Sequence, residues 1–132
     1  MSETSSVVLL IEPDDETRAA YEAALCGGGF NVIPAASCEA ARHTLDAMTP
    51  RLIIARFDVW THDECLAFVE RIKGDPRIRD VPILLTTEII TRDDLRATDL
   101  RVLRVAVGPR DGAKMAAVVG GVLTVTERRQ SA

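Results

Sequence analysis

The sequence predicts an α/β protein in which a parallel sheet is covered by helices on both faces. Five short apolar runs recur, and several are continuously apolar rather than alternating, which is typical of parallel strands buried on both sides. Segments with helical periodicity separate the runs, so that five strand–helix units follow one another. The predicted strands are VVLLI (7–11), FNVIPAA (30–36), RLIIARF (51–57), VPILLTT (81–87) and VLRVAVG (102–108).

Each intervening segment carries apolar residues at helical spacing, or a residue that can cap a helix. The expected inner faces are Tyr21, Ala24 and Leu25; Ala41, Leu45 and Met48; Cys65, Val69 and Ile72; and Met115, Val118, Val119 and Val122. Capping residues for the second to fifth helices are Ser37, Thr61 with Glu64, Thr91 with Asp94, and Asp111. The glycines of CGGGF (26–30) are then expected to end the first helix and to form the turn into the second strand.

Length and composition indicate one cytoplasmic domain spanning residues 1–132, with a core at about 6–125 and a short polar tail at 126–132. The chain has 47% hydrophobic and 27% charged residues, and no apolar run approaches the roughly 20 residues of a membrane span. MSETSS at the start lacks the basic region of a secretory signal. A net charge of −4 argues against nonspecific nucleic-acid binding. The three widely spaced cysteines are expected to be reduced thiols in or near the core.

Acidic and polar residues gather where the predicted strands end. In a doubly wound sheet the ligand crevice lies beyond the carboxyl ends of the strands, between the first and third strands if the order is flavodoxin-like, 2-1-3-4-5. That geometry selects residues 12–15, 56–60, 86–88 and 107–109. We therefore expect a flavodoxin-like three-layer sandwich of five strands and five helices, with its site at this edge.

Three stretches carry a resemblance to a known family. They are IEPDDETR (11–18), Pro50 followed by RLIIA (51–55), and IKGDPRIRDVPILLTT (72–87). Over about residues 6–125 the chain resembles the receiver domain of bacterial response regulators. Receivers accept a phosphoryl group on an aspartate that ends the third strand. An acidic pair holds Mg²⁺, a lysine neutralises the phosphate, and a Thr or Ser responds to the modification.

The residues of this chain depart from the receiver pattern at the acceptor and in the acidic loop. Counting from Pro50, the acceptor position falls on Arg56. Glu12 takes the place of the first acid, but Pro13 stands where the main metal ligand should be and Asp14 comes one residue late. Glu12 and Asp14 are the residual metal candidates, and the departures at Pro13 and Arg56 predict weak or absent Mg²⁺ binding.

The pattern is also incomplete on the far side of the pocket. Thr87 matches the hydroxyl position, but Gly108–Pro109 replaces the lysine–proline pair, and Val105 falls at the aromatic switch position. Because an aspartyl phosphate needs a carboxylate nucleophile and nearby cations, these departures predict a pseudo-receiver that is not an enzyme and uses no cofactor. A buried arginine needs a partner, so Arg56 is expected to pair with Glu12 or Asp14.

Two other functions stay open. Asp58 could accept a phosphoryl group if the third strand carries a bulge, which would make the chain an active phosphorelay receiver. A small flavodoxin-like ligand-binding protein or enzyme is the weaker alternative, since the first loop has no glycines to hold a phosphate.

The resemblance also implies a signalling partner, such as a histidine kinase or an effector. In the family, the fourth helix, fifth strand and fifth helix form contact surfaces, which include homodimer interfaces. Mixed charges in the corresponding region suit an isologous interface, in which both subunits contribute the same surface. They are Arg92, Asp93, Asp94, Arg96, Asp99, Arg101 and Arg104.

Overall fold

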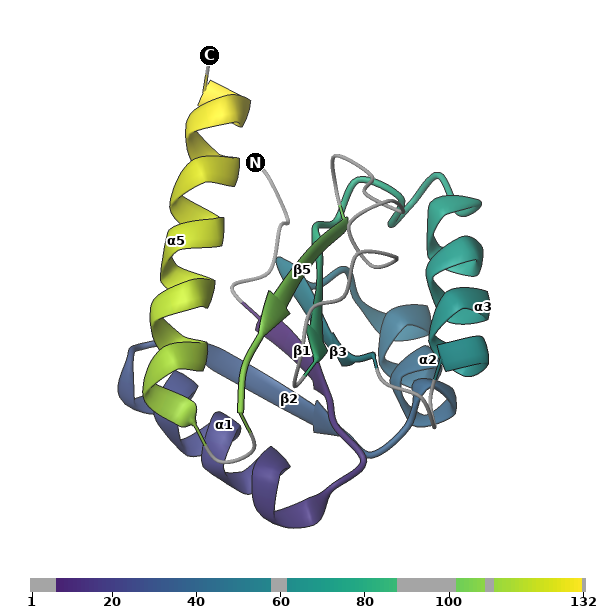
Figure 1. Cartoon of the computed structure of the whole chain (residues 1–132). Coiled ribbons are helices and arrows are strands. Elements are labelled where there is room, and N and C mark those ends of the chain that lie inside the picture. Colours follow the sequence, from purple (N-terminus) through teal and green to yellow (C-terminus); the bar gives the residue numbers. More distant parts are fainter. Residues whose placement is uncertain (1–6, 58–61, 88–101, 109–110, 132) are drawn as a thin grey trace.

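The chain forms a three-layer sandwich in which one parallel sheet lies between two layers of helices (Figure 1). The computed structural model describes residues 7–57, 62–87, 102–108 and 111–131. The strand order is β2-β1-β3-β4-β5, which confirms the predicted flavodoxin-like topology. The strands are β1 (Val7–Ile11), β2 (Asn31–Ala35), β3 (Leu52–Arg56), β4 (Ile83–Thr87) and β5 (Val102–Ala106).

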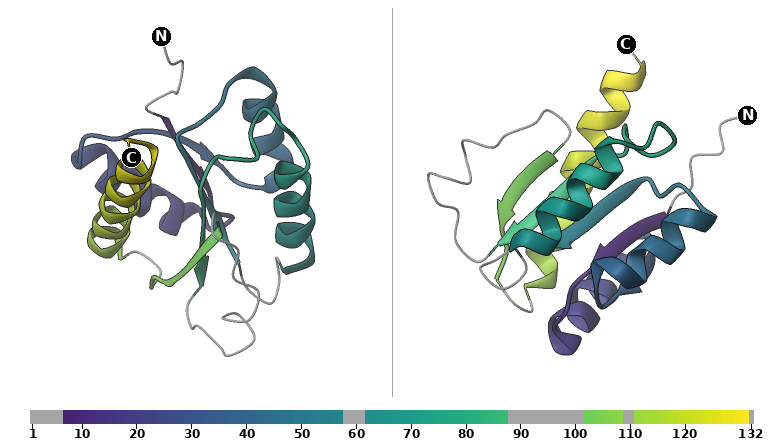
Figure 2. Two further views of the ribbon diagram at one scale, coloured as in Figure 1. Left: turned by 90° about the horizontal axis from the view of Figure 1, so that it is seen from above. Right: turned by 90° about the vertical axis from the view of Figure 1, so that its right-hand side faces the viewer.

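The helices lie in pairs on the two faces of the sheet, as Figure 2 shows from two further directions. They are α1 (Asp15–Gly27) and α5 (Gly112–Ser131) on one face, and α2 (Cys38–Ala47) and α3 (His62–Lys73) on the other. The predicted fourth helix, opened by Thr91 with Asp94, falls outside the described residues. No described helix is both long enough and apolar enough to span a membrane.

The core has two halves because successive residues of a strand point to opposite faces of the sheet. In β3, Ile53 and Ala55 pack with α2 and α3, whereas Leu52 and Ile54 pack with α1 and α5. All five residues of this strand are buried, as expected for a central parallel strand. Arg56 continues the alternation of Leu52 and Ile54, so its side chain lies on the α1 and α5 side.

Local signals at the helix ends agree with the sequence. The Ser37 side chain accepts a hydrogen bond from the amide of Ala40 at the start of α2. Gly28 caps α1, and Gly29 takes a positive φ of 93° in the turn toward β2, a conformation that favours glycine. The three cysteines are free thiols, as predicted, although Cys26 is exposed rather than in the core.

The last helix departs from the prediction. Asp111 begins it as expected, since its carboxylate accepts from the amide of Lys114 at 3.2 Å. The residues predicted to form a polar tail at 126–132 instead continue α5 as far as Ser131. Glu, Arg and Gln favour helix, and the glycine pair at 120–121 costs about 1 kcal/mol per residue without ending the helix.

The amino end of α5 packs against α1 so closely that only glycine fits. A Cβ atom on Gly112 would lie 2.7 Å from the Cβ of Ala24 and 2.9 Å from the carbonyl oxygen of Ala20. Gly121, in the same helix, has nothing within 4 Å of the corresponding position. The two glycines therefore form a matched pair for testing this contact.

We expect Gly112→Ala to lower the free energy of unfolding by about 1–3 kcal/mol, because the new methyl group meets backbone and must push α5 away from α1. Gly121→Ala should raise the same quantity by up to about 1 kcal/mol, because alanine favours helix and meets no atom. Urea denaturation of both variants measures the difference. Equal stabilisation by the two substitutions would contradict the close α1–α5 contact.

Candidate functional site

A buried ion pair joins the ends of the two central strands. Ile11 pairs with Ala55 in the β1–β3 register, so Glu12 and Arg56 follow side by side at the carboxyl edge of the sheet. The Arg56 Nε donates to the Glu12 Oε1 at 2.8 Å, and its Nη2 lies 2.7 Å from the same oxygen. The side chains are only 6% and 3% exposed, respectively. The predicted pairing of Arg56 is confirmed, with Glu12 as its partner.

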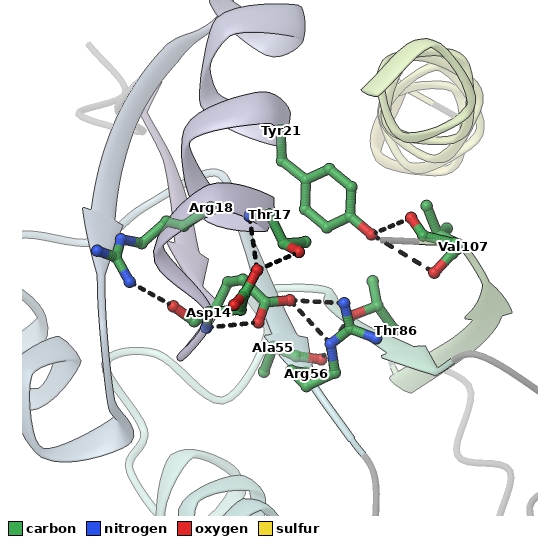
Figure 3. A network of polar contacts seen from close by, with 10 residues as sticks. Asp14, Thr17, Arg18, Tyr21, Ala55, Arg56, Thr86 and Val107 are labelled. Atoms are coloured by element: carbon green, nitrogen blue, oxygen red, sulfur yellow. Dashed lines mark hydrogen bonds and ion pairs between the residues drawn. The ribbon is translucent and has the colours of Figure 1, made fainter. Parts of the chain in front are cut away.

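Asp14 has a different role at the start of α1. Its Oδ2 accepts from the backbone amide of Thr17 at 2.9 Å and from the Thr17 hydroxyl at 2.6 Å, so Asp14 is the N-cap of the helix. The backbone amide of Asp14 in turn donates to the Glu12 Oε2 at 3.0 Å. Both carboxylate oxygens of Glu12 are therefore engaged, one by Arg56 and one by the loop (Figure 3).

Arg18 fixes the same loop from the first turns of α1. Its Nη1 donates to the Glu12 carbonyl oxygen at 2.8 Å, and its Nη2 donates to the exposed Asp15 carboxylate at 2.5 Å. The loop after β1 is thus held by backbone and side-chain contacts in one conformation.

Tyr21 brings the β5–α5 junction to this network. The side chain is fully buried, and its hydroxyl donates to the Gly108 carbonyl oxygen at 2.7 Å, with the Val107 carbonyl oxygen at 3.4 Å (Figure 3). Burial raises the pKa of Tyr21, while the positive charge of the Arg56 guanidinium opposes that rise. The phenol is therefore neutral near pH 7.

Comparison with solved structures identifies the architecture. The N-terminal domain of a response regulator receiver protein from Methanoculleus marisnigri JR1 is 24% identical, with a TM-score of 0.66 over 89% of this chain and 95% of that chain. A two-component response regulator from Legionella pneumophila is 18% identical, with a TM-score of 0.74 over 89% and 97%. The chain has the receiver fold.

A third solved structure with the receiver fold is an atypical orphan response regulator described as revealing a new phosphorylation-independent regulatory mechanism. It is 21% identical, with a TM-score of 0.71 over 89% of this chain and 95% of that chain. At the level of sequence, no protein-family model matches the chain, and a search of curated proteins finds no relative.

The other sequence-predicted residues can now be placed within the receiver fold. Pro13 is exposed in the loop after β1, and Gly108 follows β5 with its carbonyl bound to Tyr21. Thr87 is buried and pairs in register with Ala106, one residue beyond Thr86, which pairs with Arg56. Asp58 and Pro109 lie outside the described residues.

The described residues do not fit the Mg²⁺ ion that the resemblance implies. Mg²⁺ requires oxygen ligands in near-ideal octahedral geometry. Here the Glu12 carboxylate binds a guanidinium, the Asp14 carboxylate caps a helix, and Pro13 has no side-chain oxygen. Among the residues that the structure describes, no group of three or more His, Cys, Asp or Glu side chains is placed to hold a metal ion. Arg56 supplies a fixed positive charge at this edge instead.

Sequence reasoning missed three members of the network, Thr17, Arg18 and Tyr21, whereas Thr86 fell within the selected range 86–88 without being singled out. The contact of Thr17 with Asp14 had a usable signal, because an aspartate just before a helix is a preferred N-cap that accepts from the amide three residues later. Tyr21 was predicted to lie on the inner face of its helix, and it does. Its hydroxyl contact with Gly108, 87 residues away along the chain, had no local signal.

Proposed function

We propose that this chain is a receiver-like signalling module of the cytoplasm that acts by protein–protein binding, without aspartyl phosphorylation and without catalysis. The observation that carries the proposal is the buried Arg56–Glu12 pair at the edge where receivers hold their acceptor and metal. A partner such as a histidine kinase or an effector would bind the domain in its fixed state.

The chemistry of phosphoryl transfer supports this proposal. The reaction needs a carboxylate nucleophile and cations that neutralise the transferring group. A guanidinium has no free lone pair with which to attack phosphorus, and here it also engages the carboxylate of Glu12. Gly108, at the position of the receiver lysine, contributes no charge. Arg56 and Glu12 balance each other's charge, and the described residues at this edge include neither an aspartate at the acceptor position nor a lysine directly after β5.

The manner of binding is also a proposal. The fourth helix, fifth strand and fifth helix would form the contact surface, with a homodimer as one form of it. Of these elements, the structure describes β5 and α5, and Leu103 on β5 is an exposed large apolar side chain. The similar orphan regulator described as phosphorylation-independent gives a precedent for regulation of this kind in the same fold.

Incubation with acetyl phosphate and Mg²⁺ tests the proposal. The intact mass should stay unchanged, because the acceptor position carries Arg56. Calorimetry on the same protein should give no saturable Mg²⁺ site at low millimolar concentration, because the available carboxylates already have partners. A receiver with an intact acceptor aspartate is the positive control. A phosphoryl adduct mapped to Asp58 would overturn the proposal and make the chain an active phosphorelay receiver.

A further inference from the structure

The Tyr21 hydroxyl occupies a junction between two parts of the molecule that are distant in sequence. It extends from the inner face of α1 into the space between the carboxyl edge of the sheet and the start of α5 (Figure 3). A phenol has one proton to donate and lone pairs that accept. The proton goes to the Gly108 carbonyl oxygen at 2.7 Å. The Arg56 guanidinium lies on the sheet-edge side of the phenol (Figure 3), and its positive charge acts on the hydroxyl.

Gly108 belongs to the turn that begins α5. Its carbonyl oxygen also accepts from the backbone amide of Asp111 at 3.1 Å. The Asp111 carboxylate caps the helix by accepting from the amide of Lys114. The backbone carbonyl oxygen of Asp111 accepts from the amide of Met115 at 3.1 Å. A single carbonyl oxygen thus receives both the tyrosine hydroxyl and the first hydrogen bond of the turn.

The position of α5 is sensitive to this turn because its first residue has no free space. Gly112 packs against Ala20 and Ala24, on either side of Tyr21 in α1. Close-packed elements of this kind shift as units rather than deforming gradually. A change in the hydrogen bonds of Gly108 would therefore move the start of α5 relative to α1.

We propose that the Tyr21 hydroxyl couples the Arg56–Glu12 ion pair to the turn that begins α5, so that the carboxyl edge of the sheet sets the position of that helix. Hydrogen bonds join Glu12 to Arg56 and Tyr21 to Gly108, and the charge of the Arg56 guanidinium acts on the Tyr21 hydroxyl, which lies near it at this edge of the sheet (Figure 3). The inference deepens the proposed function and rests on it, since α5 belongs to the proposed binding surface. Tyr21 is a positioning residue in this scheme.

Amide hydrogen exchange of Tyr21→Phe tests the coupling. This variant keeps the buried ring and removes only the hydroxyl. The amides of Asp111 and Met115 should exchange roughly 2- to 10-fold faster relative to the amide of Ile53, which lies in the central strand and reports global stability. The matched control is Thr86→Val, which removes another buried hydroxyl of the network, one that contacts Ala55, and should leave the ratio unchanged. An unchanged ratio in Tyr21→Phe would overturn the proposal.

The connection to Arg56 has its own measurement, because Tyr21 is the only tyrosine of the chain. Its ionisation can be followed by absorbance in alkaline solution. The Arg56 charge lowers the pKa of Tyr21 and the Glu12 charge raises it. Arg56→Met should therefore raise this pKa, and Glu12→Gln, which keeps the shape of the side chain, should lower it. A tyrosine titration that neither variant moves would also overturn the coupling.

These readouts are independent of the test of the proposed function. A phosphoryl adduct on the wild-type chain would refute the proposed function. The exchange ratio and the tyrosine titration would still test the coupling. An unchanged mass together with an unchanged exchange ratio would refute the coupling alone.

Discussion

Replacing Arg56 by methionine should lower the free energy of unfolding by about 3 kcal/mol. The substitution keeps much of the side-chain volume but removes both donors from the Glu12 Oε1, which is left as an unpaired charge in a site that is almost fully buried. Removing one partner of a buried pair typically costs about 3–5 kcal/mol. The lower end applies here because the Glu12 Oε2 keeps the Asp14 amide. Urea denaturation followed by circular dichroism measures the change.

Two matched variants separate the buried pair from charge loss in general. Asp15→Asn breaks the Arg18–Asp15 bridge, in which the aspartate side chain is 87% exposed, and should change stability by no more than about 1 kcal/mol. In Glu12→Gln/Arg56→Met neither charge remains, so this double variant should recover much of the loss of the single one. A decrease below about 1 kcal/mol for Arg56→Met would mean that water reaches Glu12 and that the pair does not fix the pocket.

The strand order and the two layers of helices could be predicted because short local patterns in the sequence indicate them. Continuous apolar runs such as Leu52–Ala55 indicate strands buried on both faces, and alternating strands and helices restrict the topology. The pairing of Arg56 with an acid was predictable for the same reason, since carboxyl ends of adjacent parallel strands meet at one edge. What remained open was the choice between Glu12 and Asp14.

That choice depends on the detailed geometry of a single loop. Asp14 caps α1 and accepts from Thr17, so its carboxylate is directed to the helix, whereas Glu12 directly follows β1 beside Arg56. The contact of Tyr21 with Gly108 could not be predicted, because it depends on how closely α1 and α5 approach each other. Periodicity specifies the face of a helix but not the carbonyl group that a hydroxyl reaches across that face.

Restoring three receiver groups should make the domain accept a phosphoryl group. Arg56→Asp supplies the nucleophile, Pro13→Asp a metal ligand, and Gly108→Lys a cation for the phosphate. The described part of the chain has room for two of these changes: Pro13 is exposed, and among the described residues a Cβ atom on Gly108 would meet only the Cβ of Asp111, at 4.0 Å. Arg56→Asp alone should lower the free energy of unfolding by at least the roughly 3 kcal/mol expected for Arg56→Met, because Glu12 loses its cation and a second carboxylate then faces it in an almost fully buried site.

Phosphorylation should rise in steps as the groups are added, since each carries charge that the transition state needs. Arg56→Asp alone should react slowly with acetyl phosphate, and each further substitution should raise the rate roughly tenfold or more. Added Mg²⁺ should restore part of the lost stability of the triple variant, because an ion that binds only the folded state stabilises it. The matched control is Arg56→Asp/Pro13→Asn/Gly108→Met, which has similar side-chain sizes without the added charges and should react no faster than the single variant. Intact mass against time, in the presence and absence of Mg²⁺, gives the rates. A folded triple variant without an adduct would show that the conformation of the loop, fixed by Arg18 and the Asp14 cap, prevents the reaction independently of Arg56.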